Sequence, residues 1–315
     1  MPTADNPDST KSRTYDGKRV SIALAVLAAA LLVVRLVAMA YVPLMDTTES
    51  RYGDTARRMA ESGDWITPWY TDNVPFWGKP PLMFWTSAFG INVLGKQEIA
   101  SRLPHLLLAI VLLAVTMRIA RRRNPVSVVP TACILGSSVL FWTVAGSVVA
   151  DIALALGCAL TFDGVHRALM EGEKRSRAAR IVDAVSVVAG FTAGLLSKGP
   201  VALALTIPPI LLWAIVNRQG KALFKNLPWI AILLATAAAT CPWYILAEQK
   251  TPGFLDYFLI GEHWRRFVIP KWTSEYGDAH EYPIGTIVMY AFVGTLPWSV
   301  LLPVAAAVYR RSLHS

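Results

Sequence analysis

Residues 45–85 read MDTTESRYGDTARRMAESGDWITPWYTDNVPFWGKPPLMFW and form a polar stretch between long apolar runs. Membrane proteins usually join their spans by short turns, whereas a long connection that is rich in charged and aromatic residues is more typical of a functional loop. This segment is therefore a candidate functional loop.

The first half of this stretch has the pattern of an amphipathic helix. Asp46 followed by Glu49 fits a helix N-cap with its reciprocating residue, and Ser62-Gly63 fits a helix C-terminus. The predicted helix has about 14 residues, which is too short to span a bilayer, and we expect it to lie along the membrane surface. The aromatic residues that follow it favour the level of the lipid headgroups.

The composition indicates an all-α, polytopic membrane protein. Of the 315 residues, 54% are hydrophobic and 16% are charged, whereas soluble domains contain about 25% charged residues. The net charge of +9 falls mainly between the apolar runs, so it does not indicate nucleic-acid binding. Cys133, Cys158 and Cys241 all lie within apolar runs, without the spacing of a metal site or a disulfide framework.

Hydropathy predicts eight transmembrane spans. They lie near residues 20–41, 99–118, 125–144, 148–169, 180–197, 200–216, 228–247 and 284–308. With this count, all of the basic clusters fall on one side, which the positive-inside rule makes cytoplasmic. The expected location is thus the cytoplasmic (inner) membrane, with both termini cytoplasmic.

This topology divides the chain into regions. A disordered cytoplasmic tail (1–19) precedes a membrane domain (20–309) and a cytoplasmic end (310–315). Two long loops, 42–98 and 248–283, face outward. Pro81–Leu94 is apolar but short, and we predict that it is an interfacial or re-entrant helix.

Two carboxylates are candidate catalytic groups. Asp46 is either a simple helix N-cap or a general base at the outer membrane surface, and the two roles are compatible. Asp151 begins an apolar helix at its outer end, where an ionisable residue is either functional or snorkels to water. Asp163 and His166, within a predicted span, are given no role.

The outer loops also carry candidate groups for phosphate binding. Lys79 stands before Pro80-Pro81, where the rigid backbone holds an ammonium close to the headgroups. The alternative is a snorkelling lysine, and Lys198 has the alternative of a simple turn lysine. The last loop contains Glu262, His263, Arg265 and Arg266, which bind either a phosphate or anionic headgroups.

Several of these motifs, in this order, resemble the GT-C superfamily of membrane glycosyltransferases, in particular bacterial aminoarabinose (lipid A) transferases and protein O-mannosyltransferase-like proteins of glycosyltransferase family 39. The matching pieces are Glu49-x-Arg51-Tyr52, Gly63-Asp64-Trp65, Lys79-Pro80-Pro81-Leu82, Arg102-Leu103-Pro104, Asp151, Ser197-Lys198-Gly199-Pro200, Pro242-Trp243, Glu262-His263 and Pro297-Trp298.

The resemblance implies transfer of a sugar, with inversion, from a polyprenyl-phosphate donor on the outer face of the membrane. The acceptor is lipid A, another glycolipid, a cell-wall glycan or a protein. The family pattern implies a catalytic centre at Asp46, a functional acid at Asp151 and a donor-phosphate contact at Lys79. Among the motif residues, Glu49, Arg51 and Tyr52 are predicted to bind substrate, together with Lys198 and the cluster in the last loop.

Two departures from the family pattern stand out. Some relatives carry a Glu before the Lys and share a metal ion between it and the His, but here that position is Gly78, so we predict no metal at His263; a divalent metal remains an alternative. The relatives also continue with further spans and an outer domain, which implies that a C-terminal region is missing or supplied by a partner.

Two other functions are compatible with parts of the sequence. An inactive or truncated relative would bind polyprenyl-phosphate lipids without turnover. A transporter would place charges at mid-membrane depth along a path, whereas the charges here gather at one surface. A glycosyltransferase is therefore the favoured reading.

Overall fold

The computed structural model describes residues 7–45, 47–170, 176–269, 272–274, 276–278 and 282–313. The chain divides into two compact units, Met1–Pro43 and Leu44–Ser315. In the first unit, α1 (Pro7–Tyr41) is one continuous helix, so helical structure covers part of the tail that was predicted to be disordered. Its segment Ile22–Tyr41 is long and apolar enough to cross a membrane.

The second unit confirms the predicted all-α fold. Its helices are α2 (Thr47–Ser62), α3 (Leu82–Leu94), α4 (Glu98–Arg123), η1 (Pro125–Ser127), α5 (Val128–Ser137), α6 (Val139–Val144), α7 (Asp151–Met170), α8 (Arg177–Lys198), α9 (Val201–Val216), α10 (Gly220–Asn226), α11 (Trp229–Lys250), η2 (Asp256–Arg265), α12 (Arg266–Val268), α13 (Thr286–Gly294), η3 (Trp298–Leu301) and α14 (Leu302–Leu313). The strands form two short antiparallel pairs in the loops: β1 (Trp69–Thr71) with β2 (Val74–Pro75), and β3 (Thr273–Ser274) with β4 (Gly277–Asp278).

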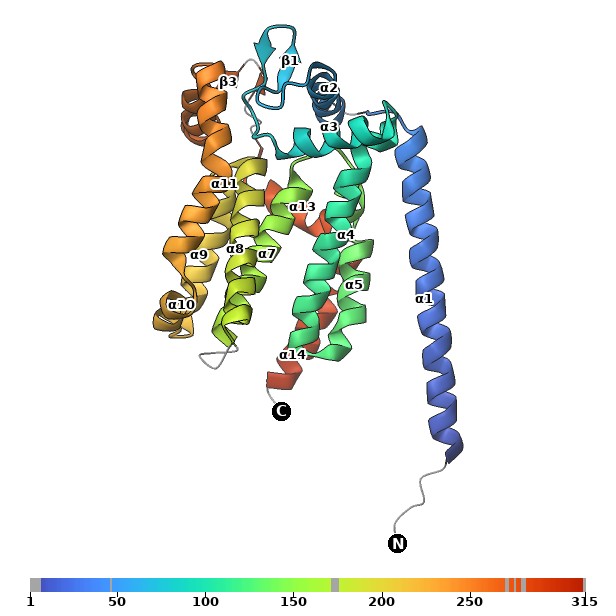
Figure 1. Cartoon of the computed structure of the whole chain (residues 1–315). Coiled ribbons are helices and arrows are strands. Elements are labelled where there is room, and N and C mark those ends of the chain that lie inside the picture. Colours follow the sequence, from blue (N-terminus) through green and yellow to red (C-terminus); the bar gives the residue numbers. More distant parts are fainter. Residues whose placement is uncertain are drawn as a thin grey trace. The chain divides into compact units, whose positions relative to one another are not determined.

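Within the second unit, α4, α7, α8 and α11 form a bundle, and α2 and α3 lie across one end of it (Figure 1). We call this the α3 end; the short α10 lies at the opposite end, the α10 end. The 13-residue α3 lies across the ends of the long helices.

The predicted count of eight spans is not confirmed. Among the described residues, five helices are long and apolar enough to span a membrane. They lie in α1, α4, α7, α8 and α11, and a sixth span is counted if α13 and α14 form one bent span. The segment 125–144 is interrupted at Ser138, whose backbone is extended. The α13–α14 pair bends by 100°. The 16 residues of α9 extend about 24 Å, which is less than the roughly 30 Å of a hydrocarbon core.

The surface helix α2 forms as predicted and ends before Gly63, which has a positive φ of 70°. Its apolar face packs in a buried cluster with α3 and the segment between them. The cluster consists of Tyr52, Ala56, Met59, Phe76, Met83, Phe84, Ala88, Val148 and Ala150. Because this cluster is closely packed, it holds the connecting segment that carries Lys79 against the bundle.

Helices α7 and α8 approach so closely that glycine is required at their contact. A Cβ atom at Gly190 would lie 2.5 Å from the backbone oxygen of Gly157, and one at Gly157 would lie 2.9 Å from the backbone nitrogen of Gly194. Gly190 and Gly194 have the G-x-x-x-G spacing of tightly packed membrane helices. This contact brings the first residue of α7, Asp151, and the last residue of α8, Lys198, to the same end of the bundle.

A buried ionic network joins α4, α7 and α8 farther along the bundle. Asp163 is fully buried and pairs with Arg118 on α4 and, at 3.3 Å, with Arg167 on its own helix. The Arg167 Nε atom lies 2.8 Å from a carboxylate oxygen of Asp183 on α8. The network therefore links the three helices through paired rather than isolated charges.

Candidate functional site

The candidate site lies at the α3 end, where an ion pair joins the ends of two helices. The Lys198 Nζ atom donates to Asp151 Oδ1 at 2.7 Å. An acid at the N-terminus of α7 and a base at the C-terminus of α8 are both favoured by the helix dipoles. Asp151 is about half exposed, at 55%, so its carboxylate also faces solvent.

Lys79 enters the same region from the segment before α3. Its Nζ atom donates to the Gly78 carbonyl oxygen at 2.7 Å and lies 3.8 Å from Glu262 Oε2. Burial lowers the pKa of Lys79, and the nearby Glu262 carboxylate opposes this effect. The charges of Lys198, Arg266 and Asp151 also act on this ammonium, which groups these side chains in one electrostatic site.

The π-helix η2 supplies the acidic partner of Lys79. Glu262 is 8% exposed and accepts hydrogen bonds from Arg266 Nη1 at 2.8 Å and from the Tyr257 hydroxyl at 3.1 Å. Arg265 instead pairs with Asp256 on the exposed side of η2, 3.4 Å away. Of the two adjacent arginines, only Arg266 therefore contacts the site. A π-helix is rare and frequently marks a functional position.

The described side chains around Lys79 carry both signs of charge. Lys198 and Arg266 are cations, whereas Asp151 and Glu262 are carboxylates. Cations held in a partly buried location favour binding of an anion, because electrostatic interactions strengthen as water is excluded.

The Tyr52 hydroxyl adds a neutral hydrogen-bonding group near these charges. Burial raises the pKa of Tyr52 to about 12, with smaller contributions from Arg51, Asp151, Glu262 and Arg266. The phenol is therefore protonated at neutral pH and can donate a hydrogen bond.

Glu49 and Arg51, predicted to bind substrate, make contacts within the protein. The Glu49 carboxylate accepts from Arg102 at 3.0 and 2.8 Å and from the Val148 amide at 3.1 Å. Arg51 Nη1 donates to the Tyr276 carbonyl at 2.8 Å and thereby connects the segment 42–98 to the segment 248–283. Asp46 lies outside the described residues.

The described residues do not form a metal site. Among them, no group of three or more His, Cys, Asp or Glu side chains lies close enough to hold an ion. His263 Nδ1 is 2.7 Å from the Phe258 carbonyl oxygen, and its Nε2 is 3.3 Å from that of Lys198. His263 therefore connects η2 to the end of α8.

Comparison with known proteins identifies the family. Residues 19–258 match the model of the dolichyl-phosphate-mannose-protein mannosyltransferases. The chain belongs to this family.

Individual members agree with the resemblance found in the sequence. The undecaprenyl phosphate-alpha-4-amino-4-deoxy-L-arabinose arabinosyl transferase of Edwardsiella ictaluri is 28% identical over 82% of this chain and 45% of the relative. The Erwinia tasmaniensis protein of the same name is 26% identical, with the same coverage. The crystal structure of ArnT from Cupriavidus metallidurans bound to undecaprenyl phosphate superposes with a TM-score of 0.79 at 26% identity, and covers 91% of this chain and 51% of ArnT.

These comparisons confirm the GT-C-type assignment and show that the family fold is that of a polytopic membrane protein. The chain spans about half the length of the curated relatives that it matches.

One side chain of this site, Tyr257, was not predicted from the sequence. Tyr257 donates to Glu262, and its ring contacts those of Trp77 and Tyr276. The five-residue separation of Tyr257 and Glu262 fits the π-helix η2, which the sequence does not reveal.

Asp64, from the Gly63-Asp64-Trp65 motif, stabilises a turn after α2. It accepts hydrogen bonds from the Ile66 and Thr67 amides and from Lys250.

Glu49→Gln tests whether Glu49 is structural. Removing one partner of a buried, bidentate ion pair leaves the Arg102 charge uncompensated, so we expect the variant to lose about 3 kcal/mol of stability. Thermal unfolding of the detergent-solubilised protein measures this loss.

The matched control is Arg57→Gln on the same helix, which breaks exposed pairs with Asp54 and Glu61. We expect this control to cost less than about 1 kcal/mol. A Glu49→Gln protein that unfolds like the wild type but binds donor poorly would contradict the structural role.

Proposed function

We propose that this chain carries the donor-binding and catalytic site of a glycosyltransferase, which moves a sugar from a polyprenyl-phosphate donor to an acceptor. The observation that carries the proposal is the partly buried Lys79 ammonium, whose Nζ atom lies 3.8 Å from Glu262 and which is influenced by the charges of Lys198 and Arg266. The solved relative with undecaprenyl phosphate bound supports the same class of donor.

The proposed reaction is a single displacement. An oxygen of the acceptor attacks the anomeric carbon, the bond from that carbon to the phosphate oxygen breaks, and the electron pair leaves with the polyprenyl phosphate. The phosphate gains about one negative charge in this step, and the cations of the site stabilise that charge as it develops. Because attack occurs opposite the leaving group, the configuration at the anomeric carbon inverts.

The same proposal gives roles to the remaining groups. Asp46 takes the proton from an acceptor hydroxyl or orders an acceptor phosphate. Asp151 orients Lys198 through their 2.7 Å contact, and the Tyr52 hydroxyl donates to the bound substrate. Glu49 holds α2 in place. The proposal names no particular sugar, and the acceptor is one of those implied by the family resemblance: lipid A, another glycolipid, a cell-wall glycan or a protein.

We further propose that the protein lies in the cytoplasmic membrane of a bacterium with its α3 end facing outward and both termini cytoplasmic. Supporting this, the basic residues at the C-terminus of α4, the N-terminus of α8 and in α10 all lie at the α10 end. In a chain without its own cysteines, a cysteine at position 72 should react with an impermeant reagent in intact cells, and one at position 220 should not. The reverse pattern would invert the orientation.

Lys79→Ala should weaken binding of undecaprenyl phosphate about 10- to 100-fold, the scale of a charge-assisted hydrogen bond. Lys79→Arg should retain part of the affinity.

Because burial lowers the pKa of Lys79, its charge is lost at a lower pH than that of an ordinary lysine. Wild-type affinity should therefore fall as the pH rises through this pKa, and Lys79→Arg should lack that alkaline loss. Titration of the purified chain at several pH values measures both effects.

The control for Lys79 is Lys96→Ala, which removes an exposed lysine that pairs with Glu61. It should bind the lipid as the wild type does. If Lys79→Ala also binds normally, Lys79 is only a snorkelling anchor.

Asp46→Asn separates catalysis from helix capping. Asn caps a helix about as well as Asp, so thermal stability should remain near that of the wild type. If the carboxylate is the base, sugar transfer should fall by roughly 10²–10⁴-fold. Transfer is measured in membranes of the producing cell, which contain any partner of the chain.

Asp72→Asn is the control in the same loop, since its side chain is 93% exposed, and it should remain active. Full activity of Asp46→Asn would show that another residue is the base, and Asp151 would be the next residue to test.

A further inference from the structure

The turn that joins α11 to η2, residues 251–255, is connected to two parts of the candidate site. On one side it leads into η2, which carries Glu262, and Glu262 lies 3.8 Å from Lys79 Nζ. On the other side, the indole nitrogen of Trp77 donates to the Thr251 hydroxyl at 3.2 Å, two residues before Lys79 in the chain. We call this segment the η2 turn. Its conformation affects both members of the Lys79–Glu262 pair.

A single carboxylate holds the η2 turn. The Gly253 amide donates to Glu248 Oε1 at 3.0 Å, and the Leu255 amide donates to Glu248 Oε2 at 2.7 Å. Each carboxylate oxygen therefore has its own backbone partner. A glutamine at this position would offer only one acceptor oxygen, because its other terminal atom is a donor.

The location of Glu248 on α11 is explained by the η2 turn and not by α11 itself. Glu248 stands in the last turn of α11, where the helix dipole disfavours an acid. Amides at the start of a helix, in contrast, lack partners within that helix and favour a negative charge. Such a conflict with a local rule is typical of a functional position.

The η2 turn packs closely against Trp77. Gly253 has a positive φ of 100°, which favours glycine, and a Cβ atom at this position would lie 3.4 Å from the Trp77 ring. The Trp77 ring also contacts that of Tyr257 on η2, with 5.9 Å between the centroids. A shift of the turn would therefore move Trp77, and with it the Gly78 carbonyl that accepts from Lys79 Nζ.

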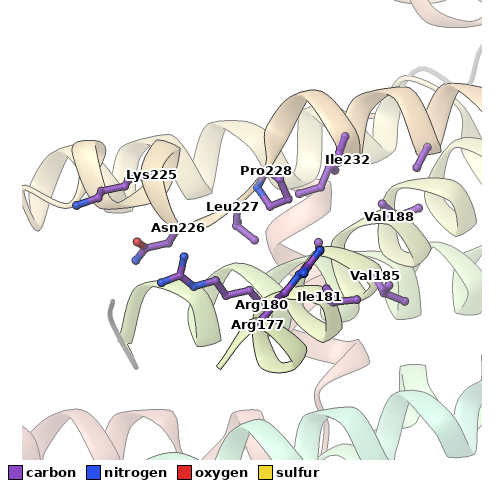
Figure 2. A pocket seen from close by; sticks show the side chains of 13 residues that line it. Arg177, Arg180, Ile181, Val185, Val188, Lys225, Asn226, Leu227, Pro228 and Ile232 are labelled. Atoms are coloured by element: carbon purple, nitrogen blue, oxygen red, sulfur yellow. The ribbon is translucent and has the colours of Figure 1, made fainter. Parts of the chain in front are cut away.

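The part of α11 that carries Glu248 is itself fixed to its surroundings. The Tyr244 hydroxyl donates to the Leu195 carbonyl of α8 at 2.7 Å, and Trp243 Nε1 donates to the Ile66 carbonyl at 3.0 Å. Toward the α10 end, by contrast, a groove of about 440 Å³ lies between α8 and the α10–α11 segment (Figure 2). The C-terminal part of α11 thus gives Glu248 a fixed base from which to hold the turn.

We propose that Glu248 is a positioning residue of the donor site. Its carboxylate holds the η2 turn, and the turn sets the location of Glu262 and of the Trp77–Lys79 segment relative to each other. Glu248 does not touch the donor in this proposal and acts through Lys79 and Glu262. The inference rests on the proposed function, in which Lys79 binds the donor phosphate.

Glu248→Gln should weaken binding of undecaprenyl phosphate by roughly tenfold, the scale of one hydrogen bond to a charged group. Titration of the purified full chain measures this change. The matched control is Asp256→Asn, which removes a neighbouring carboxylate that is 61% exposed and pairs with Arg265 at 3.4 Å. The control should bind as the wild type does, and melting temperatures show whether both variants are folded.

A double-mutant cycle shows whether Glu248 acts through Lys79. Substitutions at coupled positions have non-additive effects, whereas those at independent positions add. Glu248→Gln should therefore weaken binding much less in a Lys79→Ala chain than in the wild-type chain. A general loosening of the protein would instead weaken binding by the same factor in both chains.

Hydrogen–deuterium exchange tests the η2 turn without any donor. In Glu248→Gln, the amides of residues 251–265 should exchange faster than in the wild type, because the turn loses an acceptor and opens more often. Exchange in α2 and α4 should stay unchanged, and Asp256→Asn should exchange like the wild type throughout. Mass spectrometry of peptic fragments measures these rates.

Unchanged exchange at residues 251–265 in Glu248→Gln would show that Glu248 does not hold the turn. Faster exchange with wild-type affinity, or equal weakening in both chains of the cycle, would make Glu248 a structural residue only and would contradict the positioning role. Failure of the proposed function is a different result, namely normal binding of undecaprenyl phosphate by Lys79→Ala alone.

Discussion

The cost of removing charge from water constrains the placement of the buried ionisable groups that the structure describes. A charged side chain in hydrocarbon is tolerated only when it reaches the interface or is paired. Asp163 illustrates the second case, because it is fully buried and contacts both Arg118 and Arg167. Arg167 in turn pairs with Asp183. Breaking one member of such a network leaves a buried charge uncompensated, so the network also keeps α4, α7 and α8 together.

The same constraint makes the α3 end suitable for an anionic substrate. Lys79 is largely buried beside the Glu262 carboxylate, while Lys198 is held by Asp151. A donor phosphate would meet cations that are already positioned, and so would need little reorganisation of the protein to be stabilised. The close packing of α7 on α8 through Gly190 fixes the two helix ends on which this arrangement depends.

Local patterns in the sequence predict the helix at 47–62, the short helix at 82–94 and the ends of α7 and α8. These features depend on periodicity and on residues close in sequence. The partner of Glu49 is Arg102, 53 positions away, and the interruptions at Ser138 and between α13 and α14 depend on tertiary packing. A π-helix at 256–265 and the groove beside α8 likewise arise only when distant segments meet.

The most direct test of the account is a crystal structure of this chain with undecaprenyl phosphate. The account predicts that the phosphate lies within hydrogen-bond distance of Lys79 Nζ and contacts Lys198 or Arg266, with the isoprenoid chain leading away from the α3 end into the membrane. A phosphate bound instead at the α10 end, beside Arg177 and Arg180, or a Lys79 side chain that stays on Glu262 without touching the lipid, would contradict it.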